Sequence, residues 1–222
     1  MNVIITGATK GIGLATAKAF INEGAKIITC GRSKTDAITE NEFTFFQADL
    51  SNKHDCIAFA AFALAQGKPD VLVNNAGSYV PGSVLSDEMD ALEKMLLINL
   101  MSAWYVSNII GNAMKKNRSG HIFNISSIAG LQAYEGGGAY SISKYAMNGL
   151  NDNLRHELKS FGVKVTNVLP GAVLTSSWGD FDNSSGRIME AEDIAKMIVA
   201  ASKLSPQATV EQIVVRPQLG DL

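Results

Sequence analysis

Short apolar runs alternate with longer segments of helical periodicity along the whole chain. The apolar runs predict β-strands at residues 3–6, 26–30, 43–47, 71–74, 121–125, 163–168 and 210–215. Between them, apolar positions recur at helical spacing and predict helices at residues 12–23, 52–66, 86–116, 139–161 and 191–204, the third with a possible break. The two kinds of element therefore alternate in chain order.

Capping residues support several of these boundaries. Ser51 or Asn52 can cap the second helix, and Gly24 follows the first as a C-terminal cap would. Ser86, followed by Asp87 and Glu88, is typical of a helix start, because acidic side chains stabilise the positive end of the helix dipole.

This alternation predicts one doubly wound α/β domain of the Rossmann type over residues 1–222. Strands joined through helices run parallel, so we expect a seven-stranded parallel sheet with helices on both faces. Several strands are continuous apolar runs, as expected when both faces are covered. In such a fold, ligands bind at the carboxyl ends of the strands. Residues 176–187, rich in Ser, Asn, Asp and Gly, are expected to be irregular.

Composition narrows the class of protein. The 222 residues are 46% hydrophobic and 18% charged, which is typical of a soluble enzyme. A net charge of −2 gives no reason to expect nucleic acid or a membrane surface as partner. Cys30 and Cys56 have no metal-binding spacing, nor do His54, His121 and His156, so we predict reduced thiols and no metal site. Without a signal peptide or apolar span, a cytoplasmic location is expected.

A glycine-rich turn joins the first predicted strand to the first helix. It reads Thr6-Gly7-Ala8-Thr9-Lys10-Gly11-Ile12-Gly13, with the spacing Gly-x-x-x-Gly-x-Gly. Glycines allow close approach to a pyrophosphate, and the helix N-terminus adds N–H donors and a positive dipole. A turn with incidental glycines is the alternative, but the position at the first strand–helix junction favours a dinucleotide site.

The end of the second strand bears on which dinucleotide binds. A carboxylate there would bind the ribose 2′-hydroxyl of NAD(H), but Gly31 offers none and Arg32 follows it. Lys10 adds a second cation from the glycine turn. Asp36 falls in the next loop and is discounted. Two cations favour a 2′-phosphate, so NADP(H) is favoured and NAD(H) remains possible.

Further segments at the expected strand and helix ends resemble the motifs of the short-chain dehydrogenase/reductase family. They are Asn74-Asn75-Ala76-Gly77, Leu97-Ile98-Asn99-Leu100, Asn124-Ile125-Ser126-Ser127, Tyr140-Ser141-Ile142-Ser143-Lys144 and Pro170-Gly171-Ala172-Val173-Leu174-Thr175. With the glycine turn, the motifs run in order from residue 3 to residue 175. No single motif is decisive, but the complete ordered set indicates membership.

The resemblance implies a catalytic set of Asn99, Ser127, Tyr140 and Lys144. Family spacing to the tyrosine selects Ser127, rather than Ser126, to polarise the substrate oxygen. Tyr140 would be the general acid or base, and Lys144 would bind the nicotinamide ribose and lower the tyrosine pKa. Asn99 would hold a water that links Lys144 to solvent.

The resemblance also implies the cofactor contacts. Asp49 would bind the adenine amine, and Val173 and Thr175 the nicotinamide carboxamide. The full set expected at the cofactor is Gly7, Thr9, Lys10, Gly11, Ile12, Gly13, Arg32, Ser33, Asp49, Leu50, Asn75, Ala76, Gly77, Tyr140, Lys144, Pro170, Val173 and Thr175.

Elementary chemistry agrees with the roles of the tyrosine and lysine. A four-residue spacing puts Tyr140 and Lys144 on one helix face. A phenol has a pKa of about 10, and a nearby ammonium favours the phenolate. Ser127 could donate to the developing oxyanion. Alone, the Tyr-x-x-x-Lys pattern would be better explained by an amphipathic helix with a snorkelling lysine, but Ser127, Asn99 and the glycine turn accompany it and favour the catalytic interpretation.

Two departures from the family pattern bear on the substrate. The segment between Pro170 and the last helix is shorter than in many members, which suggests a more open pocket or one completed by a neighbouring subunit. The C-terminus lacks the glycine-rich ending of acyl-carrier-protein reductases, which leaves a general carbonyl reductase. Tyr79, Tyr134 and Trp178 are candidates to line the substrate, with core or lid packing as the alternative.

Three functional outcomes follow. The favoured one is an NADP(H)-dependent oxidoreductase that interconverts a small-molecule carbonyl and an alcohol. The alternatives are an NAD-dependent alcohol or polyol dehydrogenase and a dinucleotide-binding sensor without turnover. The resemblance also implies a homo-oligomer, dimer or tetramer, built through the two long helices.

Overall fold

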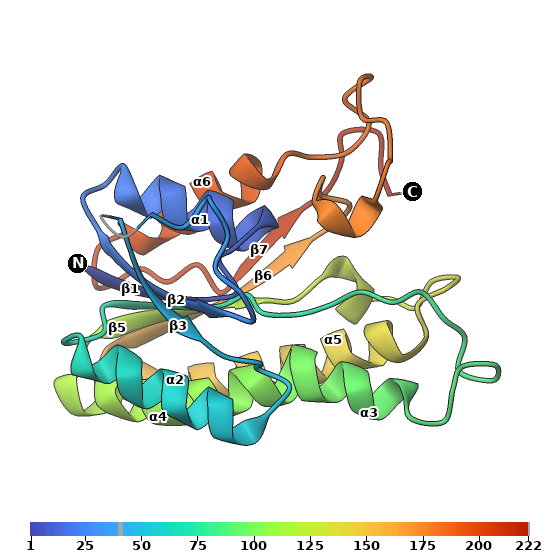
Figure 1. Cartoon of the computed structure of the whole chain (residues 1–222). Coiled ribbons are helices and arrows are strands. Elements are labelled where there is room, and N and C mark those ends of the chain that lie inside the picture. Colours follow the sequence, from blue (N-terminus) through green and yellow to red (C-terminus); the bar gives the residue numbers. More distant parts are fainter. Residues whose placement is uncertain (40–41, 222) are drawn as a thin grey trace.

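A seven-stranded parallel sheet runs through the middle of the protein (Figure 1). The computed structural model describes residues 1–39 and 42–221. The strands lie in the order β3-β2-β1-β4-β5-β6-β7, and each neighbouring pair is parallel. Their bounds are β1 Asn2–Thr6, β2 Lys26–Gly31, β3 Phe43–Gln47, β4 Val71–Asn74, β5 Gly120–Ile125, β6 Val163–Pro170 and β7 Gln212–Val215.

Helices cover both faces of this sheet. Figure 1 shows α1 (Gly11–Ile21) and α6 (Ala191–Ser202) on one face, with α2 (Lys53–Ala65), α4 (Ser102–Asn117) and α5 (Gly138–Leu158) on the other. The strand order reverses between β1 and β4, where the chain returns from β3 to start the second half. The doubly wound α/β fold predicted from the sequence is confirmed, and the reversal marks the expected ligand crevice.

Two apolar layers hold the helices to the sheet. Successive β1 residues point to opposite faces, so Val3 and Ile5 pack in one layer and Ile4 packs in the other. Phe20 of α1 and Phe59 of α2 are fully buried in these respective layers. Each such side chain contributes about 1.5–3 kcal/mol by its removal from water. The layers make the sheet a rigid support for the loops at its carboxyl end.

The predicted helix over residues 86–116 is wrong at its start. Helix α3 spans Ala91–Leu96, because the Asp87 carboxylate accepts from the Ser83 N–H at 2.7 Å and closes a turn instead. The expected break is confirmed as a π-helical segment, Leu97–Met101, between α3 and α4. This extra-wide turn contains Asn99, one of the predicted catalytic residues.

Smaller differences concern element ends. Strand β6 extends two residues beyond the predicted end to Pro170, and β7 begins at Gln212 rather than 210. Helix α5 ends at Leu158 and continues as a 3₁₀ turn, Lys159–Phe161. Within residues 176–187, expected to be irregular, the chain forms one short 3₁₀ turn, Ser176–Trp178. Asn52 rather than Ser51 caps α2, where it accepts from the His54 N–H.

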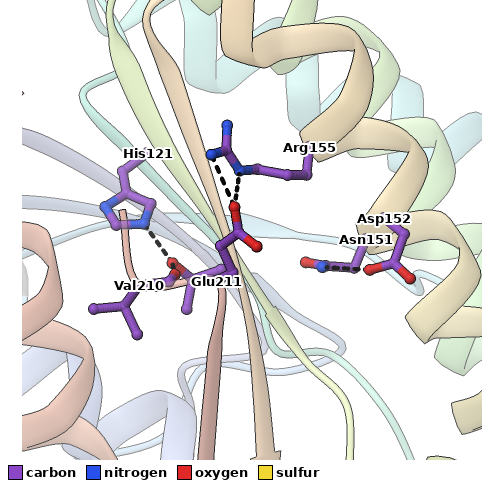
Figure 2. Close-up of polar contacts among 7 residues, drawn as sticks. His121, Asn151, Asp152, Arg155, Val210 and Glu211 are labelled. Carbon is purple, nitrogen blue, oxygen red and sulfur yellow. Dashed lines mark hydrogen bonds and ion pairs between the residues drawn. The ribbon is translucent and has the colours of Figure 1, made fainter. Parts of the chain in front are cut away.

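A group of polar contacts connects the start of β7 to α5, β5 and β6 (Figure 2). Arg155 of α5 pairs with Glu211, which directly precedes β7, at 3.0 Å. Thr166 donates to the Val210 carbonyl at 2.5 Å, so its oxygen accepts from His121 Nε2 at 2.7 Å. Burial lowers the pKa of His121 to about 3, so its ring stays neutral and structural.

Both cysteines are buried free thiols. Burial raises the pKa of each to about 12, so neither is a reactive thiolate near neutral pH. Over residues 1–39 and 42–221, each helix is too short or too polar to traverse a bilayer.

Candidate active site

A cavity of about 980 Å³ opens at the carboxyl ends of the strands. Its volume lies at the upper end of the range of about 300–1,000 Å³ for ligand pockets. Most of the predicted site residues line it: Gly7, Thr9, Lys10, Gly11, Ile12, Arg32, Asp49, Leu50, Asn75, Ala76, Gly77, Ser127, Tyr140, Lys144, Pro170, Val173 and Thr175. Of the described residues that were predicted, Gly13, Ser33 and Asn99 lie outside this lining.

The glycine turn has the backbone geometry of an anion cradle. Gly7 and Gly11 have φ of 70° and 55°, in the left-handed region that glycine tolerates. A Cβ at Gly13 would lie 2.6 Å from the Gly7 carbonyl oxygen and against the Asn75 amide. Gly13 therefore lets the turn pack on the β4 loop, and α1 presents its N-terminus to the cavity.

Thr6, at the end of β1, also shapes the turn, although sequence reasoning did not single it out. Its hydroxyl accepts from the N–H groups of Asn75 and Ala76, both at 2.9 Å. In return, the Asn75 amide donates to the carbonyls of Thr6 at 2.9 Å and Gly7 at 3.0 Å. The loops after β1 and β4 are thus locked together. The position of Thr6, a hydroxyl residue at the junction of strand and turn, could have indicated this role from the sequence.

The end of the cavity near β2 and β3 suits a phosphorylated adenosine. A Cβ at Gly31 would lie 2.9 Å from the Thr9 side chain, so this close approach requires glycine. Arg32 follows it and is exposed at the cavity. Hydrogen bonds from the Ser51 hydroxyl and N–H lower the pKa of Asp49, which keeps the carboxylate ionised. Ser33, the residue after Arg32, is exposed and lies outside the lining.

Ser127 and Tyr140 meet at the opposite end of the cavity. Ser127 caps the short 3₁₀ helix Ile128–Gly130, where its hydroxyl accepts from the Ala129 N–H at 3.1 Å. Tyr140 lies in the first turn of α5. Burial raises the pKa of Tyr140, and a hydrogen bond with Ser127 opposes that rise. The two hydroxyls that the proposed chemistry needs are therefore in contact.

Lys144 lies one turn further along α5 and is 6% exposed. Its ammonium donates to the Ile125 carbonyl at 2.9 Å and lies 5.6 Å from the centroid of the Tyr140 ring. Burial lowers the pKa of Lys144 to about 8. Lys144 was expected to lower the pKa of Tyr140, but that pKa is raised, because burial of the phenol is the largest effect on it.

Asn99 is fully buried behind Lys144, in the π-helical segment. Its side chain accepts from the Ser78 N–H at 2.8 Å and donates to the Ser78 carbonyl at 3.0 Å and the Ser143 hydroxyl at 2.9 Å. A Cβ on Gly77 would come within 2.9 Å of the Asn99 oxygen. Asn99 thus joins the loop after β4 to α5. Such π-bulges are frequent at functional sites.

The three aromatic candidates for the substrate also line this end of the cavity. They are Tyr79, Tyr134 and Trp178. The rings of Tyr79 and Tyr140 meet nearly edge to face, with centroids 4.9 Å apart. Together, the glycine turn, the basic adenosine end and the serine–tyrosine–lysine set define a dinucleotide-binding oxidoreductase site.

Comparison with known proteins agrees with this geometry. The family model for short chain dehydrogenases matches residues 1–185. An uncharacterised oxidoreductase of Staphylococcus saprophyticus is 30% identical, over 96% of both chains. A metagenomic short-chain oxidoreductase, solved in complex with NADP, is 30% identical with a TM-score of 0.85, over 98% of this chain and 97% of that one. Serine dehydrogenase from Escherichia coli is 28% identical with a TM-score of 0.85, over 97% of each.

The chain therefore belongs to the short-chain dehydrogenase family of NAD(P)-dependent oxidoreductases.

Proposed function

We propose that this protein is an NADP(H)-dependent oxidoreductase that interconverts a carbonyl and an alcohol, with Tyr140 as the general acid and base. The observation that supports this most is one continuous cavity, lined both by the glycine turn and by Ser127, Tyr140 and Lys144. The proposal treats residues 1–222 as one domain, because a single sheet supports both ends of the cavity.

The residues at the adenosine end favour NADP(H) over NAD(H). Lys10 and Arg32 both line the cavity, and Gly31 has no carboxylate for a ribose 2′-hydroxyl. Two cations suit the dianionic 2′-phosphate. The metagenomic relative that was solved with NADP supports the same assignment.

The dinucleotide, when bound, would supply or accept the hydride at the reacting carbon. In reduction, Tyr140 would donate its proton to the carbonyl oxygen, and in oxidation it would take that proton back. Ser127 would donate a hydrogen bond to the same oxygen as negative charge develops there. Lys144, with its pKa of about 8, can release a proton near neutrality and so replenish Tyr140.

Asn99 supports the catalytic residues without lining the cavity. Its hydrogen bonds to Ser78 and Ser143 hold the β4 loop and α5 at one separation. That separation determines where Lys144 stands relative to the cavity, so Asn99 is proposed as a positioning residue.

The test is a panel of ketones, aldehydes and thioesters assayed with NADPH and with NADH. We expect ketone or aldehyde reduction that is faster with NADPH. Tight NADPH binding with no turnover on the whole panel would favour the sensor alternative. Faster turnover with NADH would favour the NAD-dependent alcohol or polyol dehydrogenase.

The proposed assembly is a homo-oligomer, dimer or tetramer, formed through α4 and α5. Trp104 on α4 and Ile142 and Tyr145 on α5 are 51%, 40% and 46% exposed, which is unusual for such large apolar side chains. A monomeric mass in light scattering would contradict this. The proposed location is the cytoplasm, where the buried free thiols Cys30 and Cys56 would stay reduced.

A further inference from the structure

Three tyrosines form a connected group at the catalytic end of the cavity. The ring of Tyr79 meets that of Tyr140 at 83°, with centroids 4.9 Å apart. Burial raises the pKa of Tyr134, and a side-chain hydrogen bond with Tyr79 adds to that rise. All three side chains line the cavity. In the proposed function, Tyr140 contacts the reacting oxygen. Tyr79 and Tyr134 would therefore lie beside the substituents of the carbonyl carbon.

Further apolar side chains extend this wall from other parts of the fold. Met95 comes from α3, and Trp178 comes from the 3₁₀ turn Ser176–Trp178 after β6. The Trp178 ring packs on Phe181, with centroids 5.1 Å apart. Tyr79 and Tyr134 remain 42% and 41% exposed, so their rings have open surface to offer. Aromatic faces and edges of this kind favour a flat or ring-shaped ligand group.

The charges around the cavity argue against an anionic substrate. Among residues 1–39 and 42–221, the cationic side chains in the lining are Lys10, Arg32, Lys94 and Lys144. Lys10 and Arg32 belong to the adenosine end. Lys144 is buried and bound to the Ile125 carbonyl.

Lys94 is already neutralised by two acids. Its ammonium lies 2.9 Å from Asp90 and 3.4 Å from Glu88. The lining also includes an acid, Asp221, which pairs with Arg216. A substrate carboxylate would therefore enter the cavity without gaining a cationic partner, and an unpaired charge is costly to remove from water.

We propose that the substrate is an uncharged ketone or aldehyde, or the corresponding alcohol, with an aromatic or alicyclic ring beside the reacting carbon. This inference rests on the proposed function. In reduction the carbonyl carbon gains a hydride as NADPH becomes NADP⁺, and the oxygen gains the Tyr140 proton. The inference separates this chain from the serine dehydrogenase to which it is similar, since serine carries both a carboxylate and an ammonium.

One matched pair of substrates isolates the charge. Methyl 4-acetylbenzoate and 4-acetylbenzoate share the same ketone and ring and differ by one negative charge. With NADPH, we expect kcat/KM to be at least about tenfold higher for the ester, because the carboxylate loses water without gaining a partner. A second pair, acetophenone and butanone, isolates the ring, and we expect acetophenone to be preferred.

The failures are distinguishable. Equal or better use of the carboxylate, or of butanone, would overturn the substrate class and leave the oxidoreductase function standing. The same conclusion would follow if the protein reduced carbonyl compounds with NADPH but none that carries a ring beside the reacting carbon. No NADPH-dependent reduction of any carbonyl would overturn the proposed function, and this inference with it.

Two variants test the residues themselves. Gln132→Arg adds a cation to the lining, so we expect kcat/KM for 4-acetylbenzoate to rise about tenfold relative to its ester. Gln207→Arg adds the same charge in an exposed loop before β7 and should leave that ratio unchanged. Tyr134→Leu should reduce the preference for acetophenone, whereas Tyr134→Phe should keep it. An unchanged preference in Tyr134→Leu, or an unchanged charge ratio in Gln132→Arg, would contradict the assignment.

Discussion

The Lys144 ammonium donates a hydrogen bond to the Ile125 carbonyl at 2.9 Å. This bond ties the reactive turn of α5 to the carboxyl end of β5, two residues before Ser127. The groups that meet the substrate are thus held by the sheet and one long helix. The same burial that permits this contact lowers the pKa of Lys144 to about 8.

The titration of Lys144 should be visible in protein stability. Because its folded pKa lies below the ordinary value of 10.5, the unfolded chain binds more protons between about pH 8 and pH 10.5. The free energy of unfolding therefore receives a contribution that rises through this window, by up to about 3 kcal/mol. We expect Lys144→Met to lose this rise in urea denaturation. Lys196→Met, at an exposed site, should retain it, and identical pH profiles for the two variants would contradict the account.

Removal of the Asn99 amide should lower both stability and turnover. Asn99→Ala leaves the buried Ser143 hydroxyl and the part-buried Ser78 N–H without this partner, at a cost of about 1–3 kcal/mol in unfolding free energy. We expect kcat to fall more than NADPH affinity, because Lys144 loses its support. Asn108→Ala, at an exposed position of α4, is the matched control. Full kcat in folded Asn99→Ala would exclude a positioning role.

Arg32 should discriminate between the two dinucleotides. Arg32→Ala should raise the Kd of NADPH about tenfold or more, with little change for NADH, since only NADPH carries the 2′-phosphate. Isothermal titration at low and high salt would measure both, and the NADPH effect should shrink as salt screens the charge. Lys18→Ala, at the far end of α1, should change neither affinity. A parallel loss of NADH affinity in Arg32→Ala would argue against phosphate recognition.

Two glycine substitutions should have opposite effects. Gly13→Ala would push a Cβ against the Gly7 carbonyl oxygen and Asn75, so we expect loss of NADPH binding and lower stability. A Cβ at Gly149, within α5, would have no described atom within 4 Å apart from its own stretch of helix. Gly149→Ala should therefore raise the unfolding free energy by about 0.5–1 kcal/mol, with unchanged affinity. Thermal unfolding and a NADPH titration of both variants would check this, and normal NADPH affinity in Gly13→Ala would refute the packing argument.

The strands and most of the site could be predicted because their signals are local. Apolar runs marked the strands, and the glycine turn and Tyr140–Lys144 spacing marked the two ends of the cavity. The start of α3 could not be predicted. The Asp87 carboxylate accepts from the Ser83 N–H and closes a turn, and that bond depends on the conformation of the loop between β4 and α3. The pKa of Tyr140 could not be predicted either, because burial is set by the complete fold and outweighs one neighbouring hydroxyl.

The sequence also could not show which of two adjacent side chains would line the cavity. Ser33 and Arg32 are adjacent in sequence, yet only Arg32 lines the cavity. The sequence also did not show that the Asn99 side chain would bond to Ser78 and Ser143. Both distinctions depend on side-chain direction and partners that lie far away in the chain.

The most direct test of the account compares Tyr140→Phe with Tyr145→Phe in the same assay. Both remove one phenol hydroxyl from α5, but Tyr145 is exposed on another face and is absent from the described cavity lining. With a carbonyl substrate that the wild type reduces, we expect Tyr140→Phe to bind NADPH normally and to lose at least about a hundredfold in kcat, while Tyr145→Phe keeps both. Wild-type turnover by Tyr140→Phe would contradict the proposed mechanism.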